Sequence, residues 1–261
     1  MNLFKSMAIS FSMYSKIPMP NFEWDEDNYK HAIAFLPLVG MVIGGIALMA
    51  ARLLDLLELP ALVVAISTAL VPLVITGGFH VDGFMDVKDA LSSYQSKEKK
   101  LEIMKDPHIG AFAVIGAGVE LLIWLGAAYV LVYRAFDSNM TDILRGFYGS
   151  FPLVRAVCGI TSIVFPRAKK DGMLAIETGK SGVPDICILT FLGILSLVYI
   201  FMTNFFAGIC AVAALVVYTP LYGYKCSRNF GGVTGDTAGY YVVTGETVIL
   251  VVMAVFSALW V

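Results

Sequence analysis

Long apolar stretches alternate with short polar ones along most of the chain. Several of them reach the length of about 20 residues that a helix needs to cross the hydrocarbon core of a bilayer. The pattern therefore predicts one all-α domain, residues 1–261, folded as a polytopic integral membrane helical bundle with about seven transmembrane helices. The predicted spans are 32–54, 61–78, 111–133, 144–165, 185–203, 207–221 and 241–261.

Two further segments have a mixed pattern that predicts shorter helices. Residues 3–17 are apolar but interrupted by Lys5, Lys16 and serines, which favours an interfacial or re-entrant helix over a span. The polar segment 80–109 contains S-K-E-K-K-L-E-I-M-K, which is typical of a short amphipathic helix. In the first span, Gly40 and Gly44 form a small-xxx-small pattern that predicts close helix packing.

Composition agrees with a membrane protein. The chain has 261 residues, of which 58% are apolar and 15% charged, with a mean hydropathy of +0.79. Its net charge of −2 and lack of a basic stripe exclude nucleic acid as a partner. The lipid bilayer is the expected partner, and self-association into a homo-oligomer stays open. The four cysteines form no C-x-x-C pair, so we interpret them as packing residues.

The distribution of basic residues predicts the orientation. If residues 1–30 face the cytoplasm, so do 80–109, 166–184 and 222–240, and these segments together carry 14 of the 18 Lys and Arg residues. Cytoplasmic loops of membrane proteins are enriched in these residues. The expected location is therefore the cytoplasmic (inner) membrane of the cell, with the polar segments and any active site on the cytoplasmic side.

The most informative stretch, 77–89, reads G-G-F-H-V-D-G-F-M-D-V-K-D and follows directly on the second span. Asp82, Asp86 and Asp89 are spaced by four and three residues, which brings them to one face of a helix. Such close like charges need a cation, and Mg²⁺ binds carboxylate oxygens together with substrate phosphates. The pattern favours a phosphate-handling metal site formed by these three residues. The alternative is a solvated first helical turn, where aspartate is favoured by the helix dipole.

Other polar residues are candidates for the same site. Asp236 lies in G-G-V-T-G-D-T, a predicted glycine-rich loop, and could act in catalysis or belong to a plain turn. Arg155 and Glu246 lie inside predicted spans, where each needs a partner or a wet cavity. His80 is a candidate ligand or base. The basic residues that could bind phosphate, or only determine topology, are Lys225, Arg228, Arg167, Lys169 and Lys170.

Two classes of function fit this set of residues. Phosphoryl or phosphodiester transfer needs a metal ion, a carboxylate that accepts a proton and positive charge near the leaving phosphate. A cation-coupled membrane transporter could also use aspartates, but its ion site would lie nearer the bilayer midplane. The position of the aspartates at a span boundary favours the enzyme.

Several stretches resemble the cobalamin synthase family, also called adenosylcobinamide-GDP ribazoletransferase. They are F-S-M-Y-S-K-I-P-M-P (11–20), F-L-P-L-V-G-M-V-I-G (35–44), T-G-G-F-H-V-D-G-F-M-D-V-K-D-A (76–90), L-E-I-M-K-D-P-H-I-G (101–110), L-V-R-A (153–156) and G-G-V-T-G-D-T-A-G (231–239). The chain departs from the family pattern at Lys16, where Arg is usual, and at Val243, where many relatives carry Glu.

The resemblance implies a membrane enzyme of late vitamin B12 synthesis. It would join adenosylcobinamide-GDP to α-ribazole 5′-phosphate, or to α-ribazole, and release GMP with the help of Mg²⁺. By this resemblance Asp82, Asp86 and Asp89 are metal and diphosphate residues. The acidic motif is also similar to that of CDP-alcohol phosphotransferases, which implies Asp89 as the general base, with Asp236 as the other candidate. The candidate substrate-binding residues are His80, Lys16, Arg155, Lys225, Arg228 and Glu246.

Overall fold

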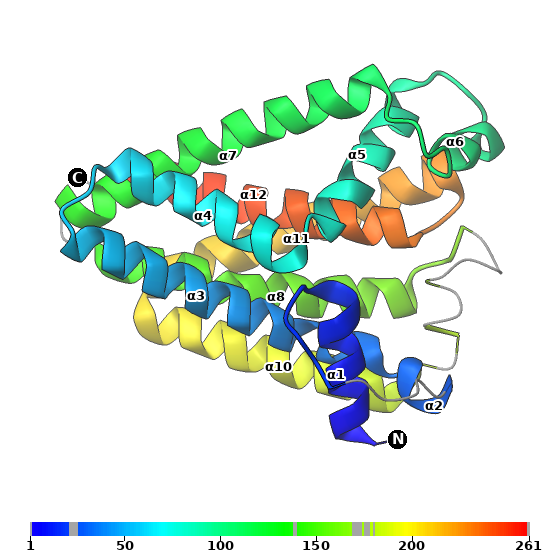
Figure 1. Cartoon of the computed structure of the whole chain (residues 1–261), viewed down its shortest axis with the longest axis horizontal. Helices are drawn as coiled ribbons and strands as arrows, with labels where there is room; N and C mark the ends of the chain where they lie inside the picture. The colour runs from blue at the N-terminus through cyan, green and yellow to red at the C-terminus, as the bar shows by residue number, and fades with distance from the viewer. Residues whose placement is uncertain are drawn as a thin grey trace.

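The structure, a computed structural model, describes residues 2–20, 26–137, 140–168, 174, 178–179 and 181–259. Within these ranges every regular element is a helix, and one isolated bridge pairs Arg167 with Val233 (Figure 1). The elements are α1 (Leu3–Tyr14), α2 (Glu26–Tyr29), η1 (Ala32–Phe35), α3 (Leu36–Leu56), α4 (Ala61–Thr76), α5 (Phe79–Ser92), α6 (Lys97–Ile103), α7 (Ala111–Asp137), α8 (Thr141–Val164), α10 (Val183–Thr203), α11 (Phe205–Phe230) and α12 (Gly235–Leu259).

The predicted fold class is confirmed. Six helical segments are long and apolar enough to cross a membrane: η1 with α3, α7, α8, α10, α11 and α12. The pair α4 and α5 is a seventh candidate if the two helices count as one broken span. The outer faces of these helices carry many exposed large apolar side chains, as expected where lipid replaces water. The chain is therefore a multi-pass helical membrane protein.

The second predicted span, 61–78, differs from a straight crossing. The helix α4 ends at Thr76, and α5 leaves it at an angle of 97°. The bend is formed by Gly77 and Gly78, which both adopt left-handed backbone angles (φ 61° and 82°). Glycine adopts this conformation without the strain that a Cβ atom would cause. The G-G pair therefore ends the span and turns the acidic stretch out of line with it.

The predicted loop 222–240 is much shorter than expected. Helix α11 continues to Phe230, and α12 begins at Gly235, six residues before the predicted start of the last span. Gly231 and Gly232 (φ 81° and 158°) form the turn. The expectation that Asp236 lies in a loop is therefore wrong: the residue belongs to the first turn of α12. A carboxylate is favoured there because it faces the positive end of the helix dipole.

The centre of the bundle is α8, which packs against α3, α10 and α12. The predicted role of Gly40 is confirmed, because a Cβ atom on it would lie 2.8 Å from backbone atoms of Phe151 and Pro152. On the other side, α12 packs against α5 and α7. The predicted amphipathic helix is α6, and it is tied to the end of α11 by Lys97, which donates to the carbonyl of Ser227 (3.0 Å). These contacts hold α5 across the bundle at one end (Figure 1).

Candidate active site

The three aspartates of α5 lie on the less buried face of that helix. His80, Gly83, Phe84, Val87 and Ala90 are its buried residues. Asp82 is exposed, and Asp86 and Asp89 are half-buried. The predicted clustering of the three carboxylates on one helix face is thus confirmed by the alternation of buried and accessible positions.

A close helix crossing brings a fourth carboxylate to this face. A Cβ atom on Gly83 would lie 2.9 Å from the Cα and carbonyl oxygen atoms of Asp236. One turn later, a Cβ atom on Gly239 would lie 2.9 Å from the carbonyl oxygen of His80. Two glycines therefore allow α5 and α12 to touch backbone to backbone. The crossing places Asp236 near enough to Asp86 to repel its carboxylate, and we call Asp82, Asp86, Asp89 and Asp236 the acidic cluster.

The carboxylates of the acidic cluster repel one another at Asp86. Partial burial, and then repulsion from Asp82, Asp236 and Asp89 in that order, raises the pKa of Asp86 from 3.8 to about 6. In the described part of the chain, Asp82, Asp86 and Asp89 form no ion pair with Lys or Arg. The cluster is therefore an environment that a cation would stabilise.

Among the described residues, no three His, Cys, Asp or Glu side chains are close enough together to enclose a metal ion by themselves. Asp89 lies toward the start of α7, where a Cβ atom on Gly110 would collide with its carboxylate oxygens. A complete protein cage is not what Mg²⁺ requires, since it usually keeps several waters and binds one or two carboxylates plus substrate phosphates. The oxygen donors of the cluster and the raised pKa of Asp86 fit such a site.

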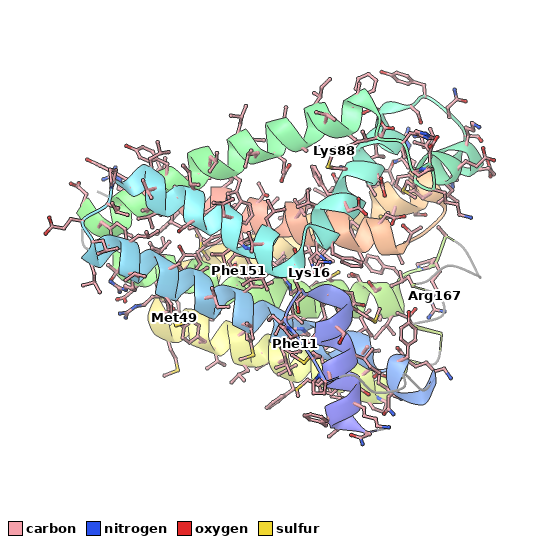
Figure 2. The ribbon with its side chains drawn as sticks, in the orientation of Figure 1. Phe11, Lys16, Met49, Lys88, Phe151 and Arg167 are labelled. Carbon is pink, nitrogen blue, oxygen red and sulfur yellow. The ribbon has the colours of Figure 1, made fainter. Side chains whose placement is uncertain are left out.

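Next to Asp82 is a cavity of about 480 Å³ that we call the outer cavity. Lys16 lines it together with Asp82, Gly77 and Gly78. The Lys16 backbone N–H donates to the carbonyl of Ile75 (2.7 Å), and its side chain lies over Gly77. Figure 2 shows Lys16 where the segment after α1 reaches the bend between α4 and α5. The structure thus brings together a cation and an anion from segments more than 60 residues apart.

Arg155 and Glu246, which were each expected to need a partner, are partners of each other. Arg155 of α8 is 1% exposed and Glu246 of α12 is 4% exposed. Arg155 donates a hydrogen bond to the Glu246 carboxylate and another to the carbonyl of Phe151 (3.1 Å). A buried charge without a partner is costly, so this pair explains how both residues are tolerated inside the bundle.

His80 faces the interior instead of the outer cavity. It is 5% exposed, and neither ring nitrogen has a hydrogen-bond partner among the described residues. It lines a second cavity, of about 220 Å³, together with Arg155 and Glu246. We call this the inner cavity. The contacts of His80 therefore do not support its expected role as a metal ligand or base beside the aspartates.

The remaining basic candidates differ in position. Lys225 is half-buried and donates to the hydroxyl of Tyr240 (2.9 Å), whose ring stacks on Phe84 of α5. Arg228 is exposed and donates to Tyr224 of its own helix (3.1 Å). Lys225 is therefore linked to α5, whereas Arg228 has no described contact with it. Arg167 donates to the carbonyl of Thr178 (2.8 Å), and Lys169 and Lys170 lie outside the described residues.

The sequence reasoning missed two polar residues of the inner cavity, Glu120 and Trp124. Both belong to α7, are one helical turn apart and line the cavity. A signal was present, since Glu120 is an acid well inside an apolar segment, and such residues in spans are usually functional or paired.

The fold and the site define a multi-pass helical membrane protein with an acidic cluster and a neighbouring lysine at one end of the bundle. A family model described as Cobalamin-5-phosphate synthase matches residues 6–254. The chain belongs to this family, and it is an enzyme, a transferase.

Curated relatives cover nearly the whole chain. An adenosylcobinamide-GDP ribazoletransferase of Lachnoclostridium phytofermentans is 36% identical over 94% of this chain and 92% of its own length. One of Clostridium botulinum is 33% identical over 98% of this chain and 99% of its own length. One of Listeria monocytogenes is 29% identical over 94% and 96%. No solved structure is significantly similar to the chain.

Proposed function

We propose that this chain transfers the adenosylcobinamide phosphate group of adenosylcobinamide-GDP to α-ribazole 5′-phosphate, or to α-ribazole, and releases GMP in a Mg²⁺-dependent reaction. The observation that carries the proposal is that Asp82, the first residue of the acidic cluster, and Lys16 line the same outer cavity, in a chain whose relatives are named for this transfer. A diphosphate needs cations and a nucleophile needs a base, and this site offers residues for both.

The metal-binding residues are Asp82, Asp86 and Asp89. A bound Mg²⁺ would neutralise charge on the phosphate oxygens and orient the diphosphate. In the reaction, a ribose hydroxyl of the ribazole forms a new bond to the phosphorus attached to cobinamide. The bond from that phosphorus to the GMP oxygen breaks, and the hydroxyl proton passes to a carboxylate.

Two carboxylates are candidates for the general base, Asp89 and Asp236. The carboxylate of Asp89 lies against Gly110 at the start of α7. Asp236 comes from another helix and adjoins Asp86 at the crossing with Gly83. The crossing supports Asp236 as the base, because it can face the nucleophile while the aspartates of α5 hold the metal ion.

Lys16 is the basic residue that best fits a phosphate contact, because it lines the same cavity as Asp82. Lys225 reaches the site through Tyr240, which stacks on Phe84. Arg228 would take part only if the substrate extends beyond the end of α11. The interior residues His80, Arg155 and Glu246 line the inner cavity and contact a different part of the substrate.

The site is proposed to face the cytoplasm from the inner membrane. The fully exposed Tyr94 lies between α5 and α6 and reports on this side. A Tyr94→Cys variant can be made in a Cys187→Ser background, since Cys187 is the exposed native cysteine and the other three are buried. An impermeant thiol reagent should label it only after the cells are permeabilised. Labelling of Tyr94→Cys in intact cells would contradict the proposed orientation and place this side outside the cytoplasm.

The central test measures GMP release by the detergent-purified chain with adenosylcobinamide-GDP and α-ribazole 5′-phosphate. Release should require Mg²⁺, stop in EDTA and fall by about a hundredfold or more in Asp82→Asn. The matched control is Asp142→Asn, which removes an exposed aspartate of α8 paired with Arg145 and should keep full activity. Folded protein without GMP release, but with uptake of a cation into liposomes, would favour the transporter.

A further inference from the structure

The inner cavity is created by the bend between α4 and α5. Figure 1 shows α4, α5 and α7 as the sides of a triangle over α12. Helix α4 packs on α7, α5 packs on α7, and both α5 and α7 pack on α12. The cavity of about 220 Å³ lies among these helices and α8. Most of its wall is apolar, and the residues include Ala69, Leu73, Phe84, Ala117, Leu121 and Val242.

Four polar side chains of this wall have atoms that lack a hydrogen-bond partner among the described residues. These atoms are both ring nitrogens of His80, Nε1 of Trp124, Nε of Arg155 and Oε1 of Glu120. His80, Trp124 and Arg155 are all more than nine-tenths buried. An unsatisfied buried polar atom costs about 1–3 kcal/mol, so several around one cavity indicate that water or a ligand satisfies them, and a ligand that displaces the water must replace these hydrogen bonds.

The shape and chemistry of the cavity select among the parts of the proposed substrates. A corrin macrocycle is far larger than this space. Guanine is of suitable size, but its many donors and acceptors would face carbon atoms over most of the wall, which is costly. Trp124 Nε1 and Arg155 Nε can only donate, so they suit a mostly apolar heterocycle with one ring nitrogen that accepts a hydrogen bond, and Oε1 of Glu120 would accept from a hydroxyl of the sugar attached to it. The rings of Phe84 and Trp124 offer faces for stacking.

The inner and outer cavities adjoin each other. Thr76 and Val81 line both of them, and Asp82 follows Val81 directly. A nucleoside whose base occupies the inner cavity would thus have its ribose beside the acidic cluster. We infer that the inner cavity binds the benzimidazole-type base of the ribazole substrate, with Trp124, His80 and Arg155 as donors to its free ring nitrogen. This inference rests on the proposed function and adds the determinant of base specificity.

The inference can be tested by a larger side chain on α7 that takes up part of the inner cavity. Ala117 lines it, and an Ala117→Leu variant should raise KM for the dimethylbenzimidazole ribotide by about tenfold or more, but KM for the smaller imidazole ribotide by less than about threefold. KM for adenosylcobinamide-GDP should stay unchanged. The control is Gly118→Leu on the same helix, where a Cβ atom meets nothing within 4 Å, and this variant should behave as wild type.

A binding measurement without catalysis separates this inference from the proposed function. Equilibrium dialysis in EDTA should show saturable binding of α-ribazole to the wild type, weakened about tenfold in Trp124→Phe, which keeps an aromatic ring but loses the N–H donor. Ribazole binding without GMP release would overturn the proposed reaction alone. The inference is overturned if GMP is released but α-ribazole does not bind. It is also overturned if Ala117→Leu raises KM equally for both ribotides, or if it raises KM for adenosylcobinamide-GDP instead.

Discussion

Two parts of the molecule hold carboxylates, and they treat the charge in opposite ways. In the interior, Glu246 is paired with Arg155, and both are buried. At the end of the bundle, Asp82 and Asp86 have carboxylate neighbours, and repulsion from Asp82 contributes to the raised pKa of Asp86. The charges of the interior pair balance each other, whereas Asp82, Asp86 and Asp89 form no ion pair with Lys or Arg in the described part of the chain. The difference separates a pair of charges that the protein itself neutralises from a group of charges that favours a bound cation.

The largest effect should come from neutralising the centre of the cluster. Asp86→Asn removes a metal ligand, and loss of several kcal/mol of transition-state stabilisation corresponds to about a thousandfold lower turnover. The unfolding temperature in Mg²⁺-free detergent should stay equal or rise, because a repulsive charge is lost. Activity at the wild-type level would remove the cluster from the reaction.

Removing one charge of the interior pair should lower stability, in contrast to the removal of Asp86. Arg155→Met leaves Glu246 buried without a partner and should lower the free energy of unfolding by about 3–5 kcal/mol, read as a lower unfolding temperature. The double variant Arg155→Met with Glu246→Leu should recover most of that loss, since an apolar pair of similar volume is tolerated. A double variant as unstable as the single one would mean that the two charges act separately.

The helix crossing that supports the cluster can be disturbed by one methyl group. Gly83→Ala places a Cβ atom 2.9 Å from the backbone of Asp236, and such overpacking costs about 1–3 kcal/mol. Turnover should fall along with stability, because Asp236 shifts relative to Asp86. The matched control is Gly118→Ala, which meets no neighbour and should stabilise α7 by up to about 1 kcal/mol. Thermal unfolding and GMP release would be measured on both variants.

The smallest effect is a pH dependence. Because the pKa of Asp86 is about 6, the residue is increasingly protonated below that pH and loses its affinity for a cation. The Mg²⁺ concentration for half-maximal activity should rise by up to about tenfold per pH unit between pH 6 and 5. The stability of the metal-free protein should instead improve at lower pH. Its folded state binds this proton more tightly than the unfolded chain, so its stability should increase as the pH falls from about 6 toward 3.8. A flat Mg²⁺ requirement would exclude Asp86 as a ligand.

Much of this arrangement could be predicted from the residue pattern. Apolar runs predict helices because the backbone must satisfy its own hydrogen bonds in lipid. The spacing of Asp82, Asp86 and Asp89 predicts their common face. Arg155 and Glu246 each indicated a missing partner, although nothing in a single sequence says that they are partners of each other.

Other features depend on tertiary contacts. The G-G pair at 77–78 indicates a break, but the angle of 97° is determined by the packing of α5 on α12 and α7. The start of α12 was missed because G-D is a common turn signal, and here burial of Tyr240 and Tyr241 favours a helix. The inner cavity could not be predicted, since its residues come from five helices and only the bend brings them together.

The short helix α4 also has a consequence for the surrounding bilayer. Its 16 residues rise about 24 Å, whereas the hydrocarbon core is about 30 Å thick. The acyl chains beside α4 must therefore compress, or the bend must sit beneath the headgroups with water reaching down to it. In either arrangement, the position of α4 and of the bend depends on the chain length of the surrounding lipids. Reconstitution in bilayers of shorter lipids should relieve this mismatch, and longer lipids should increase it at the helix that leads into the acidic cluster.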